Sequence, residues 1–183
     1  MAGRSRDQVA AIVGAYEFSG FELIGDIGGG RGHLLRAVLD RSPRARGVLF
    51  DLPHVIGDAG TVASERLTFQ AGDFFTDELP RCDAYLLMDV LHDWGDEEAI
   101  TILQAIRRAA PSHAKLLICE LLISADPGPD VAKMLDVHMM VMLGGRQRTR
   151  QHNEALLDAA GFAVNRQIDT ASDMAILEAV TAP

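Results

Sequence analysis

The stretch from Leu23 to Gly32, LIGDIGGGRG, joins a short apolar run to a group of glycines through one acid, Asp26. Residues without a Cβ atom allow a tight turn, so this pattern predicts a strand that turns sharply into a helix. Backbone N–H groups at such a turn are open to a nucleotide-like ligand. The stretch therefore predicts an α/β fold with a cofactor loop at the end of its first strand.

The spacing of the glycines narrows the kind of cofactor. Asp26, Gly28, Gly30 and Gly32 form a D-x-G-x-G-x-G pattern, whereas dinucleotide loops usually read G-x-G-x-x-G. No Lys-Ser or Lys-Thr pair follows the glycines, as a nucleoside triphosphate loop would require. Both phosphate-binding interpretations are weakened, and a nicotinamide-dependent oxidoreductase is supported by the glycine-rich turn alone.

Two further apolar runs also end in acids. Asp51 follows the second run and can accept hydrogen bonds from ribose hydroxyls, and Asp73 follows the third and can accept from an adenine amine. Phe74 or Leu52 can cover the adenine ring, and Asp26 would repel phosphate but attract an ammonium group. Three acids at three strand ends favour S-adenosylmethionine as the cofactor.

The order of apolar runs predicts a doubly wound, Rossmann-like sheet, because runs that are apolar throughout are typical of parallel strands covered on both faces. We expect one domain over residues 1–183, with residues 1–20 as a helical lead-in and Asp96 as the N-cap of a helix. The short link 169–173 makes the last two strands antiparallel. Expected strands are 23–27, 47–50, 67–71, 84–88, 115–122, 162–168 and 174–180, and expected helices are 9–16, 32–40, 55–62, 96–110, 131–143 and 151–160.

Composition excludes several classes of partner. With 26 acids against 17 Lys and Arg, the net charge of −9 argues against nucleic acid, and we expect the arginines of segment 146–150 to lie in a solvated loop. No apolar segment has the length of a signal peptide or a membrane span. Cys82 and Cys119 are expected to be buried thiols, and Met134 is expected in the core. These features predict a cytoplasmic protein with no membrane partner.

His92 and Glu120 are the candidates for chemistry, since both follow predicted strands and would share the edge that holds the cofactor acids. A histidine oriented by a carboxylate can take a proton near neutral pH. Alternatively, His92 caps the helix that begins at Asp96, and Glu120 is a solvated strand end. The remaining histidines lack metal-ligand spacing, so no metal is expected.

Seven motifs together resemble the class I S-adenosylmethionine-dependent O-methyltransferases of the plant caffeate and bacterial antibiotic-tailoring type. These motifs are DIGGGRG, FDLP, GDFF, LHDWGDEEA, ICE, MLGGRQRT and LLDAAGF. The resemblance implies a seven-stranded sheet, mostly parallel with an antiparallel last strand, and methyl transfer to a hydroxyl of a small aromatic molecule. It implies that His92 is the general base and that Glu120 holds it. The implied cofactor contacts are Gly28, Gly30, Asp51, Leu52, Asp73 and Phe74.

The sequence departs from that family in three ways. Gln147 stands where members usually have a carboxylate beside the histidine, and Met88 stands where a lysine is common, which leaves only a backbone contact to the cofactor. Members also usually carry an N-terminal helical domain that dimerises and closes over the substrate. We therefore expect either a fragment or a protein that works without that lid, with an exposed apolar patch where the domain would dock. A homodimer stays open, as does a catalytically impaired S-adenosylmethionine-binding module.

Overall fold

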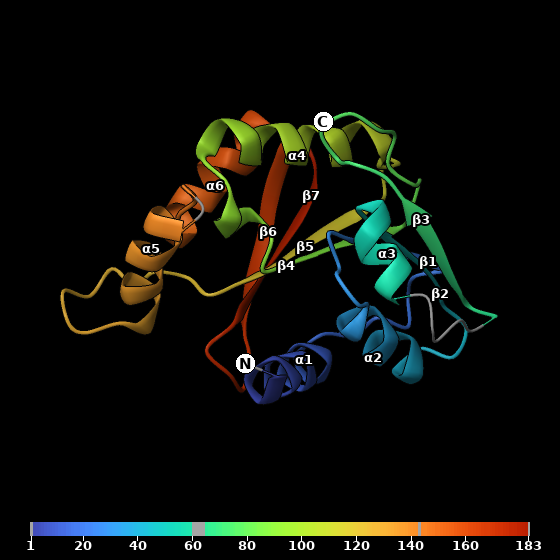
Figure 1. Ribbon diagram of the computed structural model, residues 1–183, viewed down its shortest axis with the longest axis horizontal. Helices are drawn as coiled ribbons and strands as arrows, with labels where there is room; N and C mark the ends of the chain where they lie inside the picture. Colours follow the sequence, from blue (N-terminus) through green and yellow to red (C-terminus); the bar gives the residue numbers. More distant parts are fainter. Residues whose placement is uncertain (1, 60–64, 143, 183) are drawn as a thin grey trace.

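The computed structural model describes residues 2–59, 65–142 and 144–182, and its centre is a seven-stranded sheet (Figure 1). The strand order is β3-β2-β1-β4-β5-β7-β6. The first five strands pair in parallel, and β7 lies antiparallel between β5 and β6. The predicted fold class is confirmed. The strands are β1 (Leu23–Ile27), β2 (Arg46–Asp51), β3 (Leu67–Ala71), β4 (Ala84–Met88), β5 (Lys115–Glu120), β6 (Phe162–Asp169) and β7 (Ala175–Thr181).

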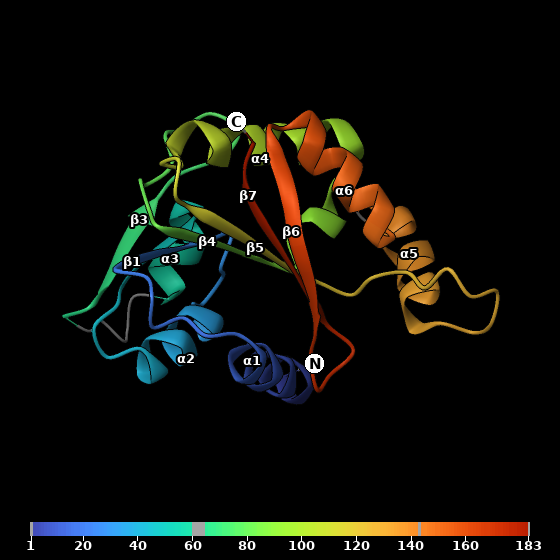
Figure 2. The same ribbon diagram turned by 180° about the vertical axis from the view of Figure 1, so that it is seen from behind.

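Helices cover both faces of this sheet, as the two opposite views show (Figures 1 and 2). Helices α1 (Ala2–Ala15), α2 (His33–Arg41) and α3 (Pro53–Ala59) lie on one face, and α4 (Asp96–Ala109) and α6 (Arg150–Ala159) lie on the other. Successive strand residues serve opposite faces, as a pleated strand requires. Leu86 packs toward α1 and α2, whereas Leu87 packs toward α4.

The predicted elements differ from the observed ones mainly at their ends. The first helix begins at residue 2 rather than 9, and α3 begins at Pro53 rather than residue 55. Residues 60–62 of the predicted helix 55–62 and residue 143 of the predicted helix 131–143 lie outside the described residues. Asp96 is not an N-cap: Gly95 caps α4, and the Asp96 carboxylate instead pairs with the Arg148 guanidinium at 2.9 Å.

One other prediction, on the burial of the cysteines, agrees with the structure. Cys82 and Cys119 are free and buried. Across the described part of the chain, every helix is too short or too polar to cross a membrane.

Helix α5 (Val131–Met142) lies at the edge of the molecule, beside α6 and away from the sheet (Figures 1 and 2). The side chain of Met134 is 76% exposed, so the prediction that it belongs to the core is wrong. The reason is that α5 packs through Ala132 and Leu135, whereas most of its other apolar side chains face outward. The exposed apolar side chains of α5 are Val131, Met134, Val137, Met140, Val141 and Met142.

Candidate active site

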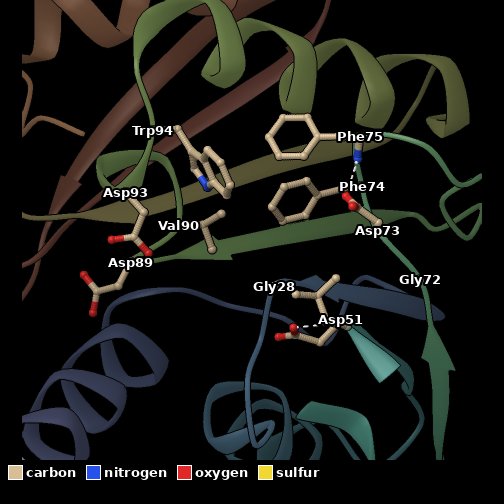
Figure 3. Close-up of a pocket in the computed structure, with 11 residues that line it drawn as sticks. Gly28, Asp51, Gly72, Asp73, Phe74, Phe75, Asp89, Val90, Asp93 and Trp94 are labelled. Atoms are coloured by element: carbon tan, nitrogen blue, oxygen red, sulfur yellow. Dashed lines mark hydrogen bonds between the residues drawn. The ribbon is translucent and has the colours of Figure 1, made fainter. Parts of the chain in front are cut away.

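A pocket of about 220 Å³ lies at the carboxyl ends of the parallel strands (Figure 3). Loops after β1, β2, β3 and β4 all reach it, as is typical for ligand sites in open α/β sheets. Five predicted cofactor residues are thereby brought together, although they are far apart in the sequence. The residues that line the pocket are Gly28, Asp51, Leu52, Gly72, Asp73, Phe74, Phe75, Asp89, Val90, Asp93 and Trp94.

The glycine loop has a backbone that other residues would strain. Gly28 and Gly30 have φ angles of 68° and 59°, in the left-handed region. A Cβ atom on Gly29 would lie 2.4 Å from the Asp26 carboxylate carbon, so the loop can approach that acid only through a glycine. The loop is tied to β2 because the Gly30 N–H donates to Oδ2 of Asp51 at 2.7 Å.

Two strand-end acids are fixed in place by backbone groups. Oδ1 of Asp51 accepts from the Leu52 N–H at 2.7 Å, and Oδ1 of Asp73 accepts from the Phe75 N–H at 2.9 Å. A carboxylate oxygen has two lone pairs, so both acids can still accept a hydrogen bond from a ligand. These fixed acceptors suit neutral donors such as hydroxyl and amino groups.

Three aromatic side chains form one wall of the pocket (Figure 3). Phe75 packs edge to face against Phe74 and Trp94, with ring centroids 4.8 Å apart in both pairs. Phe75 and Trp94 were not among the predicted site residues. The signal was present in the sequence, because each lies within two residues of a predicted one, Phe74 or His92.

Three predicted cofactor residues do not line the pocket. Gly30 acts through its hydrogen bond to Asp51, and Met88 ends β4 and packs against the core on the α1 and α2 face. Asp26 is 1% exposed beneath the glycine loop, and burial raises the pKa of its carboxyl to about 7. The predicted contacts of Asp26 and Met88 with a cofactor stay predictions.

His92 lies beside the pocket, on the short 3-10 helix Leu91–Asp93 that follows β4. Its Nδ1 is 2.8 Å from Oε2 of Glu120. Because a carboxylate accepts, Nδ1 carries the proton, and Nε2 is the nitrogen left for chemistry. The other oxygen of Glu120 accepts from the N–H groups of Val90 and Leu91 at 3.2 and 2.9 Å. Glu120 therefore fixes both the ring and its turn.

The structure contradicts the alternative roles of His92 as a helix cap and of Glu120 as a solvated strand end. Glu120 is 3% exposed, so it is not a solvated strand end. Gly95, not His92, caps α4.

Two more carboxylates face the ring of His92. Oδ1 of Asp93 is 3.3 Å from Nε2, and Oδ1 of Asp89 is 3.8 Å from Nδ1. Burial disfavours the charged ring, but hydrogen bonds with Asp93 and Glu120, with the charges of Glu120 and Asp89, outweigh it and raise the pKa of His92 to about 10. The carboxylates around the ring therefore favour its protonated form.

Asp89, His92 and Glu120 also have ligand atoms within 4.8 Å of one another, so they could hold a divalent cation. The expected absence of a metal stays a prediction.

Gln147 lies in a narrow crevice with His92 and Glu120, and it is 6% exposed. Its backbone N–H donates to Oδ1 of Asp136 at 2.9 Å, which ties the crevice to α5. The site thus brings together the three predicted catalytic residues, and Gln147 adds no charge to it.

Arg148 corrects the prediction of a solvated arginine loop, because it is 3% exposed. Its guanidinium donates to the carbonyl oxygens of Leu91 and Trp94, each at 2.8 Å, and pairs with Asp96. The planar group can satisfy several acceptors at once. Arg148 therefore braces the turn that carries His92, a role that its sequence neighbours did not indicate.

Comparisons with known proteins agree with this geometry. The model of the O-methyltransferase domain family matches residues 1–163. A phenazine O-methyltransferase of Lysobacter antibioticus is 44% identical over 97% of this chain, which covers 54% of that relative. The solved structure of LaPhzM superposes with a TM-score of 0.94 at 44% identity, over 98% of this chain and 56% of that one.

A more distant solved structure is human N-acetylserotonin methyltransferase in complex with SAM. It has a TM-score of 0.89 at 31% identity, over 98% of this chain and 52% of that one. The chain thus spans about half the length of the relatives it matches. By its sequence and its fold, the chain belongs to the O-methyltransferase domain family.

Proposed function

We propose that this chain is the catalytic part of an S-adenosylmethionine-dependent O-methyltransferase that methylates a hydroxyl group of a small aromatic molecule. The observation that carries the proposal is the His92–Glu120 pair, with Nδ1 and Oε2 2.8 Å apart, beside a pocket formed by strand-end acids and aromatic rings. The phenazine and acetylserotonin enzymes act on aromatic compounds by name, which supports this substrate class.

The adenosine part of the cofactor fits the side of the pocket formed by Asp51, Asp73 and Phe74. Both acids are held by backbone N–H groups and can accept from ribose hydroxyls and the adenine amine. Phe74 and Leu52 offer apolar surface to the base on that side. When bound, the cofactor supplies an electrophilic methyl group on a positive sulfur.

His92 would act as the general base, and Glu120 would hold its tautomer. Nε2 takes the hydroxyl proton as the substrate oxygen forms its bond to the methyl carbon and the carbon–sulfur bond breaks. The protein otherwise supplies alignment of oxygen, carbon and sulfur. Because the surrounding carboxylates favour the protonated ring, Nε2 has to be free of its proton before it can act as a base, and the substrate hydroxyl has to replace Asp93 at Nε2.

Calorimetric titration with S-adenosylmethionine and S-adenosylhomocysteine, followed by a methyl-transfer assay on a panel of phenols with and without EDTA, tests this function. We expect both ligands to bind and at least one phenol to be methylated irrespective of EDTA. Binding without turnover would favour the impaired module, and Gln147→Glu would then be assayed for restored activity. Binding of a nicotinamide cofactor in place of both ligands would overturn the proposal.

We also propose that the apolar face of α5 is covered in a homodimer. Six large apolar side chains are exposed on this one helix, and apolar side chains gathered on one surface are typical of an interaction site. Sedimentation of the chain with Met134→Lys and Val137→Lys should show a monomer where the unsubstituted chain sediments as a dimer. A monomer in both cases would contradict this proposal.

A further inference from the structure

The backbone of Gly145 lies directly against the turn that carries His92. A Cβ atom on Gly145 would lie 2.1 Å from the His92 carbonyl oxygen and 2.5 Å from the Asp93 carbonyl carbon. Gly145 is buried, and these neighbours are backbone atoms, which cannot move aside as the end of a flexible side chain can. Only glycine therefore fits at position 145 while the turn keeps its place.

Residues 145–149, which we call the bracing segment, are held by other parts of the chain. The Gln147 N–H donates to Oδ1 of Asp136 on α5 at 2.9 Å, and the Arg148 carbonyl accepts from the Ile123 N–H at 3.0 Å. The segment then continues directly into α6. It is thus anchored to α5, to the residues that follow β5 and to α6.

The turn of His92 is held through both kinds of backbone group. Oε1 of Glu120 accepts from two N–H groups at the start of the turn, and Oε2 lies 2.8 Å from Nδ1 of His92. The Arg148 guanidinium binds two carbonyl oxygens of the turn, and Gly145 packs against the backbone of the two residues between them. Glu120 and the bracing segment together therefore fix the position of the ring.

We propose that Gly145 is a positioning residue for the base, because its missing Cβ atom lets the bracing segment lie against the turn and so fixes the place of Nε2 of His92 beside the pocket. The inference rests on the proposed function. Methyl transfer depends on the alignment of the reacting atoms, and a misplacement of about 1 Å can lower the rate about 10²-fold. A methyl group at position 145 would push the turn away without removing any group that takes part in the chemistry.

A double-mutant cycle on the rate of methyl transfer tests the inference. We expect Gly145→Ala to lower kcat about 10²-fold. The Kd of S-adenosylmethionine should change far less, because Asp51 and Asp73 lie apart from this turn (Figure 3). In a His92→Ala background, Gly145→Ala should lower the remaining rate by less than about threefold, since no base is left to displace.

Gly14→Ala is the matched control, because a Cβ atom on Gly14, in α1, meets no atom within 4 Å. It should leave the rate unchanged in both backgrounds. A similar loss from Gly145→Ala with and without His92 would show a general structural role and overturn the inference. Full activity of Gly145→Ala would overturn it as well.

A second pair of variants loosens the bracing segment without a steric clash, and it decides the question if Gly145→Ala does not fold. Asp136→Ala removes the acceptor of the Gln147 N–H, whereas Asp136→Asn retains an oxygen acceptor. We expect Asp136→Ala to lower kcat about tenfold in the presence of His92, and Asp136→Asn to keep most of the activity. Equal kcat values for the two variants would show that the bracing segment does not hold the base.

The position of the ring can also be measured without turnover. The ring C–H resonances of His92 in the free chain, assigned by their loss in His92→Gln, should shift in Gly145→Ala and stay in place in Gly14→Ala. Unshifted resonances in Gly145→Ala would overturn the inference. If the unsubstituted chain methylates no phenol, the proposed function fails, and the resonances still decide whether Gly145 places the ring.

Discussion

The two ends of the pocket hold acids in different ways. At one end, Asp51 and Asp73 each accept backbone N–H groups and stand at separate strand ends. Beside the other end, the imidazole of His92 has three carboxylates within 3.8 Å, those of Asp89 and Asp93 from the pocket and that of Glu120 from the adjoining crevice. Fixed, separated acceptors suit the hydroxyl and amino groups of a nucleoside, whereas crowded carboxylates favour a positive charge. The difference teaches that the first end is suited to recognise a nucleoside and the second to hold a positive charge.

Among the substitutions at the two ends, replacement of the base His92 should have the largest effect, and that effect is on the rate of methyl transfer. We expect His92→Ala to lower the rate of methyl transfer about 10²- to 10⁴-fold, because a positioned base contributes that much. The affinity for S-adenosylmethionine should change far less, since His92 does not line the pocket. Assays of kcat and calorimetric Kd on the same preparation check this, and full activity in His92→Ala would refute the assigned base.

Asp26, which lies beneath the glycine loop, makes the stability of the folded protein depend on pH. Its pKa is raised by burial from 3.8 to about 7, so the folded protein binds a proton more tightly than the unfolded chain does. That contribution is fully present below about pH 4 and is lost as pH rises through 7, at a cost of about 4 kcal/mol. Urea unfolding of the free chain should therefore lose less stability between pH 4 and 8 in Asp26→Asn. If the free energy of unfolding had the same dependence on pH in both proteins, the result would contradict the burial of the Asp26 carboxyl.

Arg148 stabilises the turn that carries His92, so its replacement should destabilise that part of the protein. Arg148→Met leaves the buried carbonyl of Leu91 and the partly buried carbonyl of Trp94 without their guanidinium donor. We expect the free energy of unfolding to fall by about 2–4 kcal/mol. The exposed Arg150→Met, on α6, serves as control and should change stability by less than about 1 kcal/mol. Similar values for both variants in urea unfolding would argue against the brace.

The smallest effect is expected for Asp51→Asn, at the nucleoside end. Loss of a charged acceptor should weaken the binding of S-adenosylmethionine about 10- to 100-fold. S-adenosylhomocysteine should weaken by the same factor, because the nucleoside parts of the two ligands are identical. A change in the ratio of the two Kd values by calorimetry would show that Asp51 acts on the part of the ligand that differs between the two, and would remove the contrast between the ends.

Much of the fold could be predicted because buried parallel strands are apolar along their whole length. The runs 67–71 and 84–88 were predicted with the same bounds that β3 and β4 have. Helix ends were less predictable, because capping depends on neighbours from elsewhere in the chain. Aspartate is a residue type that often caps helices, but the Asp96 carboxylate pairs with the Arg148 guanidinium instead.

The site could be predicted where a functional side chain directly follows a predicted strand. Asp51, Asp73 and Phe74 line the pocket, and His92 meets Glu120, as their places at neighbouring strand ends indicate. Asp26 shows the limit of that reasoning, since its side chain turns under the loop rather than into the pocket. A strand end places a backbone, but the packing around it decides where the side chain points.

The sequence by itself determined the strand pattern, the glycine loop and the set of acids at the strand ends, because these depend on local composition and period. Only the tertiary structure decided the exposure of Met134, the burial of Arg148 and the pairing of Arg148 with Asp96. The physical reason is that charge and burial depend on partners distant in the chain. The Arg148 guanidinium lies 2.9 Å from the Asp96 carboxylate, which is 52 residues away in the sequence, and no spacing of residues along the chain specifies that pairing.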